Sequence, residues 1–117
     1  WEAIMSAVSF KLDNLIAIVD NNGFQNEIEP SETIMDSGNF EDKWENFGWN
    51  VRSVDGHNIS ELYSAFAEYN VENKPKVVIA HTLKGKGVSF MENNNEWHHN
   101  RLTETYYNLA LQEMGEI

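Results

Sequence analysis

Two short stretches of this 117-residue chain carry the side chains best suited to chemistry. The first is Asp20-Asn21-Asn22-Gly23, which directly follows the apolar residues 15–19. Carboxylate and amide oxygens are hard donors of the kind that bind Mg²⁺ or Ca²⁺, and Gly23 can adopt the positive φ that a sharp turn requires. The same residues would equally form an Asn-Gly turn without a ligand. The sequence alone therefore leaves a cation site and a plain turn as two open interpretations.

The second stretch lies between residues 81 and 99. Lys84-Gly85-Lys86-Gly87 offers flexible backbone N–H groups and two cations, which suits a phosphate or diphosphate, although a solvated loop would look the same. Its spacing is not that of a Walker A loop. Trp97-His98-His99 could supply an imidazole as an acid, a base or a diphosphate donor. A loop histidine can also be merely exposed, and no nucleophile–base triad can be assembled from the spacing.

The surrounding pattern predicts the elements that position these residues. The apolar run 15–19 is typical of a strand buried on both faces in the middle of a parallel sheet, and residues 2–12 are apolar on nearly every side, as in a helix buried all round. The other expected elements are a loop over 25–38, a helix over 40–47 capped by Asn39, a half-buried strand over 49–54 near the sheet edge, a helix over 59–70 that starts at Asn58, a strand over 77–82, and a helix from Thr103 to Met114.

The alternation of helices and strands predicts an α/β fold: a parallel sheet with helices on both faces and right-handed crossovers. Ligands of such sheets bind at the carboxyl ends of the strands, which is where both polar stretches fall. The chain starts at Trp1, already inside the first predicted helix. We therefore expect residues 1–117 to be part of one domain that lacks its N-terminal portion.

The composition and net charge exclude several classes of function. A net charge of −11 argues against nucleic-acid binding, because phosphates would be repelled over most of the surface. The absence of cysteine excludes disulfides and thiolate chemistry within the chain. No apolar run approaches the roughly 18 residues of a membrane span, and no signal peptide is visible. These features favour a cytoplasmic protein without membrane or nucleic-acid partners.

The ordered series of motifs resembles transketolase through nearly the whole chain. It comprises Trp1-Glu2-Ala3, residues 11–23 (KLDNLIAIVDNNG), Phe47-Gly48-Trp49, Val54-Asp55-Gly56-His57, Lys74-Pro75, residues 81–91 (HTLKGKGVSFM) and Trp97-His98. The similarity falls within the thiamine diphosphate-binding domain, and is strongest to the short N-terminal subunits of split bacterial and archaeal transketolases.

This resemblance implies an enzyme that uses thiamine diphosphate and Mg²⁺ or Ca²⁺ to transfer a two-carbon ketol unit between sugar phosphates, as in the pentose phosphate pathway. The family's cofactor motif begins with Gly-Asp-Gly and closes with an asparagine that matches Asn22. By the same resemblance, Asn22 binds the metal through its amide oxygen and Phe24 through its backbone carbonyl, with Gly23 between them. His98 matches a catalytic histidine near the cofactor diphosphate and the substrate, and Glu2 matches an interface glutamate.

The expected partners are sugar phosphates and a C-terminal transketolase half, in a homodimer or a heterotetramer. The Gly-Asp-Gly motif and the family's activating glutamate do not occur in the 117 residues, so we expect the chain alone to be inactive. Asn26 stands where many members carry an apolar residue and His99 where they carry glycine, which bears on substrate choice. The alternatives are an enzyme of the deoxyxylulose-phosphate-synthase type and a non-catalytic homologue that only binds a partner.

Overall fold

The computed structural model describes residues 1–24, 38–68 and 71–115. The chain divides into two compact units, which are treated separately below. The described parts of the first unit are residues 1–21, 38–68 and 71–82, and they contain a sheet with its helices. Those of the second unit are residues 22–24 and 83–115, and they contain a 3₁₀ helix and an α-helix.

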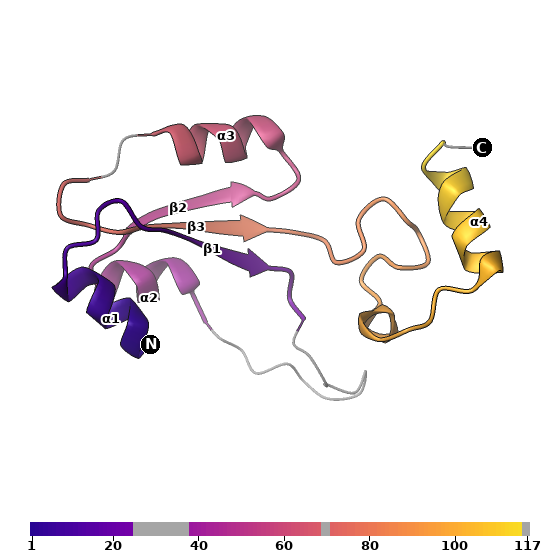
Figure 1. Cartoon of the computed structure of the whole chain (residues 1–117), viewed down its shortest axis with the longest axis horizontal. Coiled ribbons are helices and arrows are strands. Elements are labelled where there is room, and N and C mark those ends of the chain that lie inside the picture. The colour runs from indigo at the N-terminus through magenta and orange to yellow at the C-terminus, as the bar shows by residue number, and fades with distance from the viewer. Residues whose placement is uncertain (25–37, 69–70, 116–117) are drawn as a thin grey trace. The chain divides into compact units, whose positions relative to one another are not determined.

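The sheet of the first unit has three parallel strands, in the order β1-β3-β2 (Figure 1). They are β1 (Ile16–Asn21), β2 (Asn50–Asp55) and β3 (Lys76–His81). The register places both Asn21 and Asp55 opposite His81, so all three strands end level with one another. The parallel arrangement predicted from the alternating elements is thereby confirmed.

Helices cover both faces of this sheet, as predicted (Figure 1). Helices α1 (Glu2–Ser9) and α2 (Phe40–Asn46) lie on one face, and α3 (Ile59–Ala67) lies on the other. The core forms where α1 and α2 meet the sheet, because the apolar side chains of both helices and of the central strand converge there. Its buried members are Ala7, Trp44, Trp49, Val77 and Ile79.

Strand β1 differs from its prediction. It lies at an edge of the three-stranded sheet and not in its middle, and its residues alternate between exposed and half-buried. Ile18 is 62% exposed, because α3 contacts only β2 and β3 and no helix among the described residues covers that face of β1. The fully buried central strand is β3 instead, where Val77, Val78 and Ile79 have no exposed surface.

The first helix is shorter and less buried than predicted. α1 ends at Ser9, and Lys11 adopts a φ of 54°, which breaks the helical path before β1. Ala7 is its only buried residue, whereas Met5 and Phe10 are 47% and 75% exposed. The described chain therefore covers α1 on one side only, and the predicted burial of its other side by a partner stays a prediction.

The predicted helix starts are confirmed by side-chain caps. The oxygens of Asn39, Asn58 and Thr103 accept hydrogen bonds from backbone N–H groups in the first turns of α2, α3 and α4 (Glu104–Glu113). α3 ends at Ala67, earlier than the predicted residue 70, since Glu68 is already extended. The predicted loop over 25–38 lies outside the described residues except for Gly38.

The second unit contains an element that the sequence pattern did not predict. Residues 95–98, expected as polar loop, form the 3₁₀ helix η1 (Asn95–His98). The rings of Phe90, Trp97 and Tyr106 form a cluster with centroids 4.9–5.1 Å apart, which attaches η1 to α4. Among the residues that the structure describes, no helix is long and apolar enough to cross a membrane.

Candidate functional site

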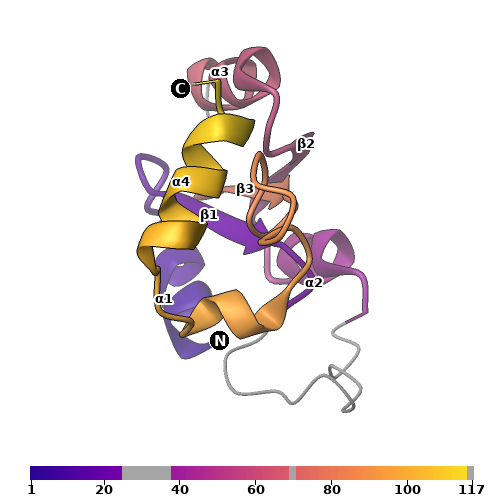
Figure 2. The same ribbon diagram turned by 90° about the vertical axis from the view of Figure 1, so that its right-hand side faces the viewer.

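The carboxyl ends of the three strands face the viewer in Figure 2. Hydrogen bonds between polar side chains connect these ends. The Thr82 hydroxyl donates to Asp20 Oδ1, and the Thr82 backbone N–H donates to the carbonyl of Asn21 at 3.4 Å. The Asn21 side-chain amide lies 3.3 Å from Nδ1 of His81. The ends of β1 and β3 are therefore connected by side chains as well as by the backbone ladder.

A second set of contacts continues from His81 toward β2 and α2. His81 Nε2 lies 2.7 Å from Ser53 Oγ, and the Ser53 hydroxyl donates to Glu41 Oε1 at 2.6 Å. The pKa of Glu41 is lowered, first by the hydrogen bond from Ser53 and to a smaller extent by the nearby His81. Sequence reasoning missed this group, because its members come from four separate elements.

Asn22, Gly23 and Phe24 lie together in one tight turn. Asn22 Oδ1 accepts the backbone N–H of Phe24 at 2.8 Å, and Gly23 has a φ of 75°, as the predicted turn requires. A Cβ atom at Gly23 would have no atom within 4 Å. The glycine is therefore needed for its backbone conformation and not for close packing.

The oxygens of this turn fit a hard divalent cation. An amide oxygen has two lone pairs, so Asn22 Oδ1 can accept the Phe24 hydrogen bond and also bind a metal. The described residues contain no group of three or more His, Cys, Asp or Glu side chains that could hold a metal ion. A metal at the turn would thus depend on amide and backbone oxygens together with ligands from elsewhere.

The Lys84–Gly87 loop is tightly folded within the second unit. The Lys84 carbonyl accepts the N–H of Asn93 at 3.0 Å, and the N–H of Gly87 donates to Glu92 at 3.0 Å. Gly85 has a φ of 74°, and a Cβ atom there would come within 2.3 Å of the Met91 carbonyl oxygen. Glycine at position 85 is therefore required by both conformation and space.

His98 lies at the end of η1 beside this loop. Its Nδ1 is 3.3 Å from the ammonium of Lys84. An ammonium group can only donate, so the contact requires an unprotonated Nδ1 and leaves the ring proton on Nε2. The neighbouring His99 packs edge-on against His98, with ring centroids 4.6 Å apart. Of the two adjacent histidines, His98 is therefore the one that faces the Lys84 ammonium.

The loop that carries Lys84 is also attached to the C-terminal helix. The backbone N–H and the hydroxyl of Ser89 both donate to the carboxylate of Glu113 on α4, and they lower the pKa of that carboxyl group. Together with the aromatic cluster, this clamp holds the loop and η1 against α4. The sequence suggested Lys84 and His98 separately, but not their contact or this support.

The remaining predicted positions lie away from these contacts. Glu2 is in the first turn of α1, and its side chain is almost fully exposed. Asn26 lies outside the described residues. None of the predicted site residues borders the open hollow between β2 and α3, which is lined by Arg52, Ser53, Val54, Ser60, Glu61, Ser64, Ala65 and Glu68.

Comparison with known proteins identifies the family to which this chain belongs. The family model described as "Transketolase, thiamine diphosphate binding domain" matches residues 1–115. Among solved structures, the crystal structure of transketolase from Campylobacter jejuni matches 97% of this chain with a TM-score of 0.83 and 30% sequence identity, over 18% of its own length.

Sequence relatives give the same result. The 6-deoxy-6-sulfo-D-fructose transketolase subunit SqwG of Clostridium sp. (strain MSTE9) is 41% identical over 97% of this chain, and a subunit of the apulose-4-phosphate transketolase of Phocaeicola vulgatus is 38% identical over 99% of it. Human transketolase is 38% identical. The chain spans about two fifths of the length of the two subunits and 18% of the human enzyme. The chain belongs to the family of the transketolase thiamine diphosphate-binding domain.

Proposed function

We propose that these residues form part of a transketolase that transfers a two-carbon ketol unit between sugar phosphates. The observation that carries the proposal is the Asn22–Phe24 turn, directly after β1, in a chain of this family. Residues 1–117 would then be part of one cofactor-binding domain, which other parts of the protein complete. The cytoplasmic location stays a prediction.

In this proposal, the turn contributes two oxygens to a divalent cation, Mg²⁺ or Ca²⁺. They are Oδ1 of Asn22 and the backbone carbonyl of Phe24. Mg²⁺ keeps several water ligands and binds substrate or cofactor phosphates in addition to one or two protein groups. Two protein oxygens from this turn are consistent with that type of site, with further ligands outside the described residues.

Lys84 and His98 are the proposed donors to the diphosphate and to the substrate. With Lys84 donating to Nδ1, His98 presents Nε2–H as a donor, and the ammonium has further protons for a phosphate oxygen. Thiamine diphosphate, when bound, supplies the stabilisation of a carbanion that the protein side chains cannot provide. The residues of this chain would hold the cofactor, and His98, with its proton on Nε2, would serve as the proton donor.

The relatives bear on the substrate and the partner. Two of them are named as subunits, one of a transketolase for 6-deoxy-6-sulfo-D-fructose and the other of one for apulose 4-phosphate. We infer that this chain also works with a second polypeptide as its partner, and that Glu2, exposed on α1, lies at an interface between protomers. The substrate class is an anionic sugar, for which a pentose phosphate is one candidate.

The test uses the assembled enzyme that contains these residues. Titration calorimetry should show thiamine diphosphate binding that depends on Mg²⁺, and mass spectrometry should detect two-carbon transfer from a ketose phosphate to an aldose phosphate. Binding without transfer for any anionic sugar would favour the non-catalytic alternative. Absence of Mg²⁺-dependent cofactor binding would contradict the proposal.

A further inference from the structure

Within the second unit, Asn94 joins the loop that carries Lys84 to the 3₁₀ helix that carries His98. It directly precedes η1 and is partly buried. Its hydrogen bonds run in both directions along the chain, back to the preceding loop and forward into η1. All of the residues in these contacts belong to one compact unit. Asn94 is therefore the junction between the two segments that carry the proposed donors.

The contacts toward the loop hold the backbone of Lys84 close to the start of η1. The backbone N–H of Asn94 donates to the Met91 carbonyl at 3.2 Å, and its side-chain amide donates to the Phe90 carbonyl at 3.4 Å. The preceding residue, Asn93, has a φ of 52°, a conformation in which asparagine is enriched. The N–H of Asn93 donates to the Lys84 carbonyl at 3.0 Å.

The contacts in the other direction fix the start of η1. Asn94 Oδ1 accepts the N–H of Glu96 at 3.0 Å, and the Asn94 carbonyl accepts the N–H of Trp97 at 3.3 Å. η1 has only four residues, so it gains few hydrogen bonds of its own and depends on contacts at its ends. His98 is its last residue, and the imidazole Nδ1 lies 3.3 Å from the Lys84 ammonium. The contacts thus run from the Lys84 backbone through Asn94 and η1 back to the Lys84 side chain.

We propose that Asn94 is a positioning residue for the diphosphate and substrate site: by capping η1, it holds the imidazole of His98 against the Lys84 ammonium. The proposal rests on the proposed function, which assigns both ligands to Lys84 and His98. Asn94 acts through His98, because its own hydrogen bonds are made to the backbone of residues 90–97.

Three substitutions test this role. Asn94→Ala removes the capping oxygen, whereas Asn94→Ser supplies a hydroxyl oxygen that caps about as well as an amide. The aromatic cluster still attaches η1 to α4 in both variants, so both should fold. Asn108→Ala is the matched control, since Asn108 is exposed on α4.

The first readout is the ¹⁵N signal of His98 Nδ1 in the histidine-labelled assembled enzyme at pH 8 without cofactor, with thermal melting as a measure of folding. Loss of a signal in His98→Ala identifies it, and Lys84→Met gives its position when no ammonium donates to Nδ1. We expect Asn94→Ala to move the signal toward the Lys84→Met position. Asn94→Ser and Asn108→Ala should leave it in place. An unmoved signal in a folded Asn94→Ala enzyme would overturn the proposal.

The second readout is the Mg²⁺-dependent dissociation constant of thiamine diphosphate in the same variants. Asn94→Ala should bind about fivefold more weakly, the usual scale for loss of a capping acceptor, and Asn94→Ser should stay within about twofold. In a His98→Ala enzyme, adding Asn94→Ala should cause no further loss, because the effect passes through His98. A further fivefold loss in that double variant would overturn the proposal. If the unmodified enzyme does not bind thiamine diphosphate, the proposed function fails, and the His98 signal still decides whether Asn94 positions the imidazole.

Discussion

The side-chain oxygen of Asn22 has an observed role as the acceptor of the Phe24 N–H and a proposed role as a metal ligand. Asn22→Ala removes both the acceptor for the Phe24 N–H and the proposed metal ligand. We expect Mg²⁺-dependent affinity for thiamine diphosphate to fall at least tenfold, or about 1.4 kcal/mol, in calorimetric titrations of the assembled enzyme. Asn22→Asp keeps an oxygen at both contacts and should lose less. The exposed Asn46 at the end of α2 is a matched control, and a loss equal to that of Asn46→Ala would remove Asn22 from the site.

His98 and His99 are adjacent, but the contact with the Lys84 ammonium is made by His98. We expect His98→Ala to lower kcat/KM by about 100-fold or more, the low end for loss of a positioned proton-transfer group. His99→Ala should cost far less, since the resemblance to transketolase assigns the catalytic role to His98 and places His99 where many members carry glycine. Steady-state kinetics of the assembled enzyme would measure both effects. Equal losses would show that the roles of the two residues have been assigned wrongly.

Contacts between residues that are adjacent in the chain could be predicted from the sequence, whereas contacts between residues that are distant in the chain were missed. Asn22, Gly23 and Phe24 are consecutive, so their turn chemistry could be read directly, and the turn is observed. The contacts at the carboxyl ends of the strands join Glu41, Ser53, His81 and Asn21, which are far apart in the sequence, so their contacts could not be predicted from it. The phosphate or metal that each of these residues binds stays a prediction.

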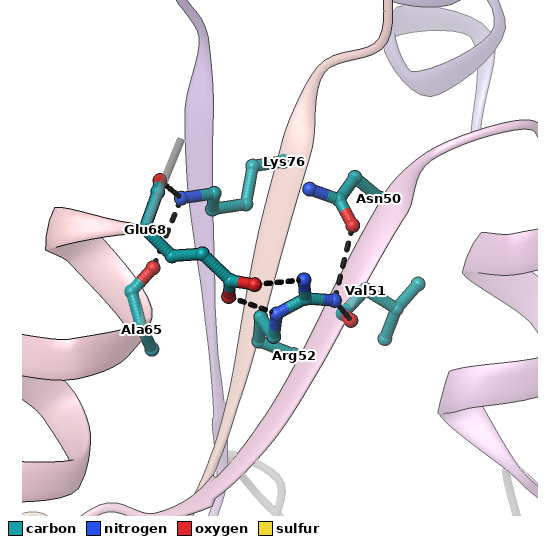
Figure 3. Close-up of polar contacts among 6 residues, drawn as sticks. All are labelled: Asn50, Val51, Arg52, Ala65, Glu68 and Lys76. Atoms are coloured by element: carbon teal, nitrogen blue, oxygen red, sulfur yellow. Dashed lines mark hydrogen bonds and ion pairs between the residues drawn. The ribbon is translucent and has the colours of Figure 1, made fainter. Parts of the chain in front are cut away.

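Among the elements, α3 is held to the sheet by an unusual buried cation. Lys76, at the start of β3, has no exposed surface, and its ammonium donates to the carbonyls of Ala65 and Glu68 at the end of α3 (Figure 3). A cation is favourable at this helix terminus, where carbonyl groups lack partners. The contact also explains why α3 ends near Ala67: its last carbonyls turn to Lys76 in place of a further helical turn.

Replacement of this cation should be costly. Lys76→Met keeps an apolar stem of similar length but leaves two carbonyl groups without their donor. We expect the free energy of unfolding to fall by about 1–3 kcal/mol, the cost of a buried unsatisfied polar group. Denaturant titration would measure it, with Lys74→Met as the control, since Lys74 is exposed. Equal stability of the two variants would mean that the buried ammonium contributes nothing to α3.

The ion pair beside Lys76 predicts a specific response to acid. The guanidinium of Arg52 donates to the Glu68 carboxylate, at 2.6 Å for one of the two contacts, and lowers the pKa of Glu68 below its ordinary value of 4.5 (Figure 3). A group whose pKa is lower in the folded state stabilises that state above its unfolded pKa, and this contribution disappears as pH falls through the folded pKa. Glu68 contributes fully at neutral pH and progressively less below about 4.5.

The comparison of Glu68→Gln with the unmodified protein isolates this contribution from other carboxylates. We expect Glu68→Gln to be less stable at about pH 7, and the difference to shrink as the pH is lowered below about 4.5. Because Glu68 is exposed in part, the effect should be small and should weaken at high salt. Thermal melts over this pH range would measure it. A difference that grows on acidification would contradict the assigned direction of the pKa shift.

The element predictions succeeded where local chemistry decides the structure. Asn39, Asn58 and Thr103 were recognised as caps because a capping residue acts on the N–H groups that follow it within three residues. The burial of β1 could not be predicted in the same way. An apolar run indicates that a strand can be buried, but only the position of α3 over β2 and β3 shows which faces are covered.

For the molecule as a whole, the exposed apolar surface is the main consequence of this arrangement. Met5 on α1, Phe10 directly after that helix and Ile18 on β1 are all exposed. Exposed apolar groups on this scale usually mark a surface that another chain or segment covers. We expect the 117-residue chain, produced alone, to self-associate, and light scattering with sedimentation would show particles larger than a monomer.

A matched pair of variants tests which surface is responsible. Phe10→Lys combined with Ile18→Lys should reduce this association. Ile59→Lys serves as the control and should change it little, because Ile59 is also exposed but belongs to α3, which contacts β2 and β3 and neither α1 nor β1. A monodisperse monomer for the unmodified chain, with a cooperative melt, would contradict the expectation.

The strand order also governs how the chain can fold while it is being made. Among the described residues, β1 and β2 do not pair with each other, and each pairs with β3, which the ribosome synthesises last of the three. β1 ends at Asn21 and β3 begins at Lys76, so at roughly 5–20 residues per second β1 must wait roughly 3–11 s before its partner has been made. During that interval the apolar strand β1, joined later by β2, is present as an unpaired edge, which chaperones bind and which aggregates in their absence. The rate of translation through residues 22–75 should therefore influence the yield of folded protein more than the rate through residues 83–115.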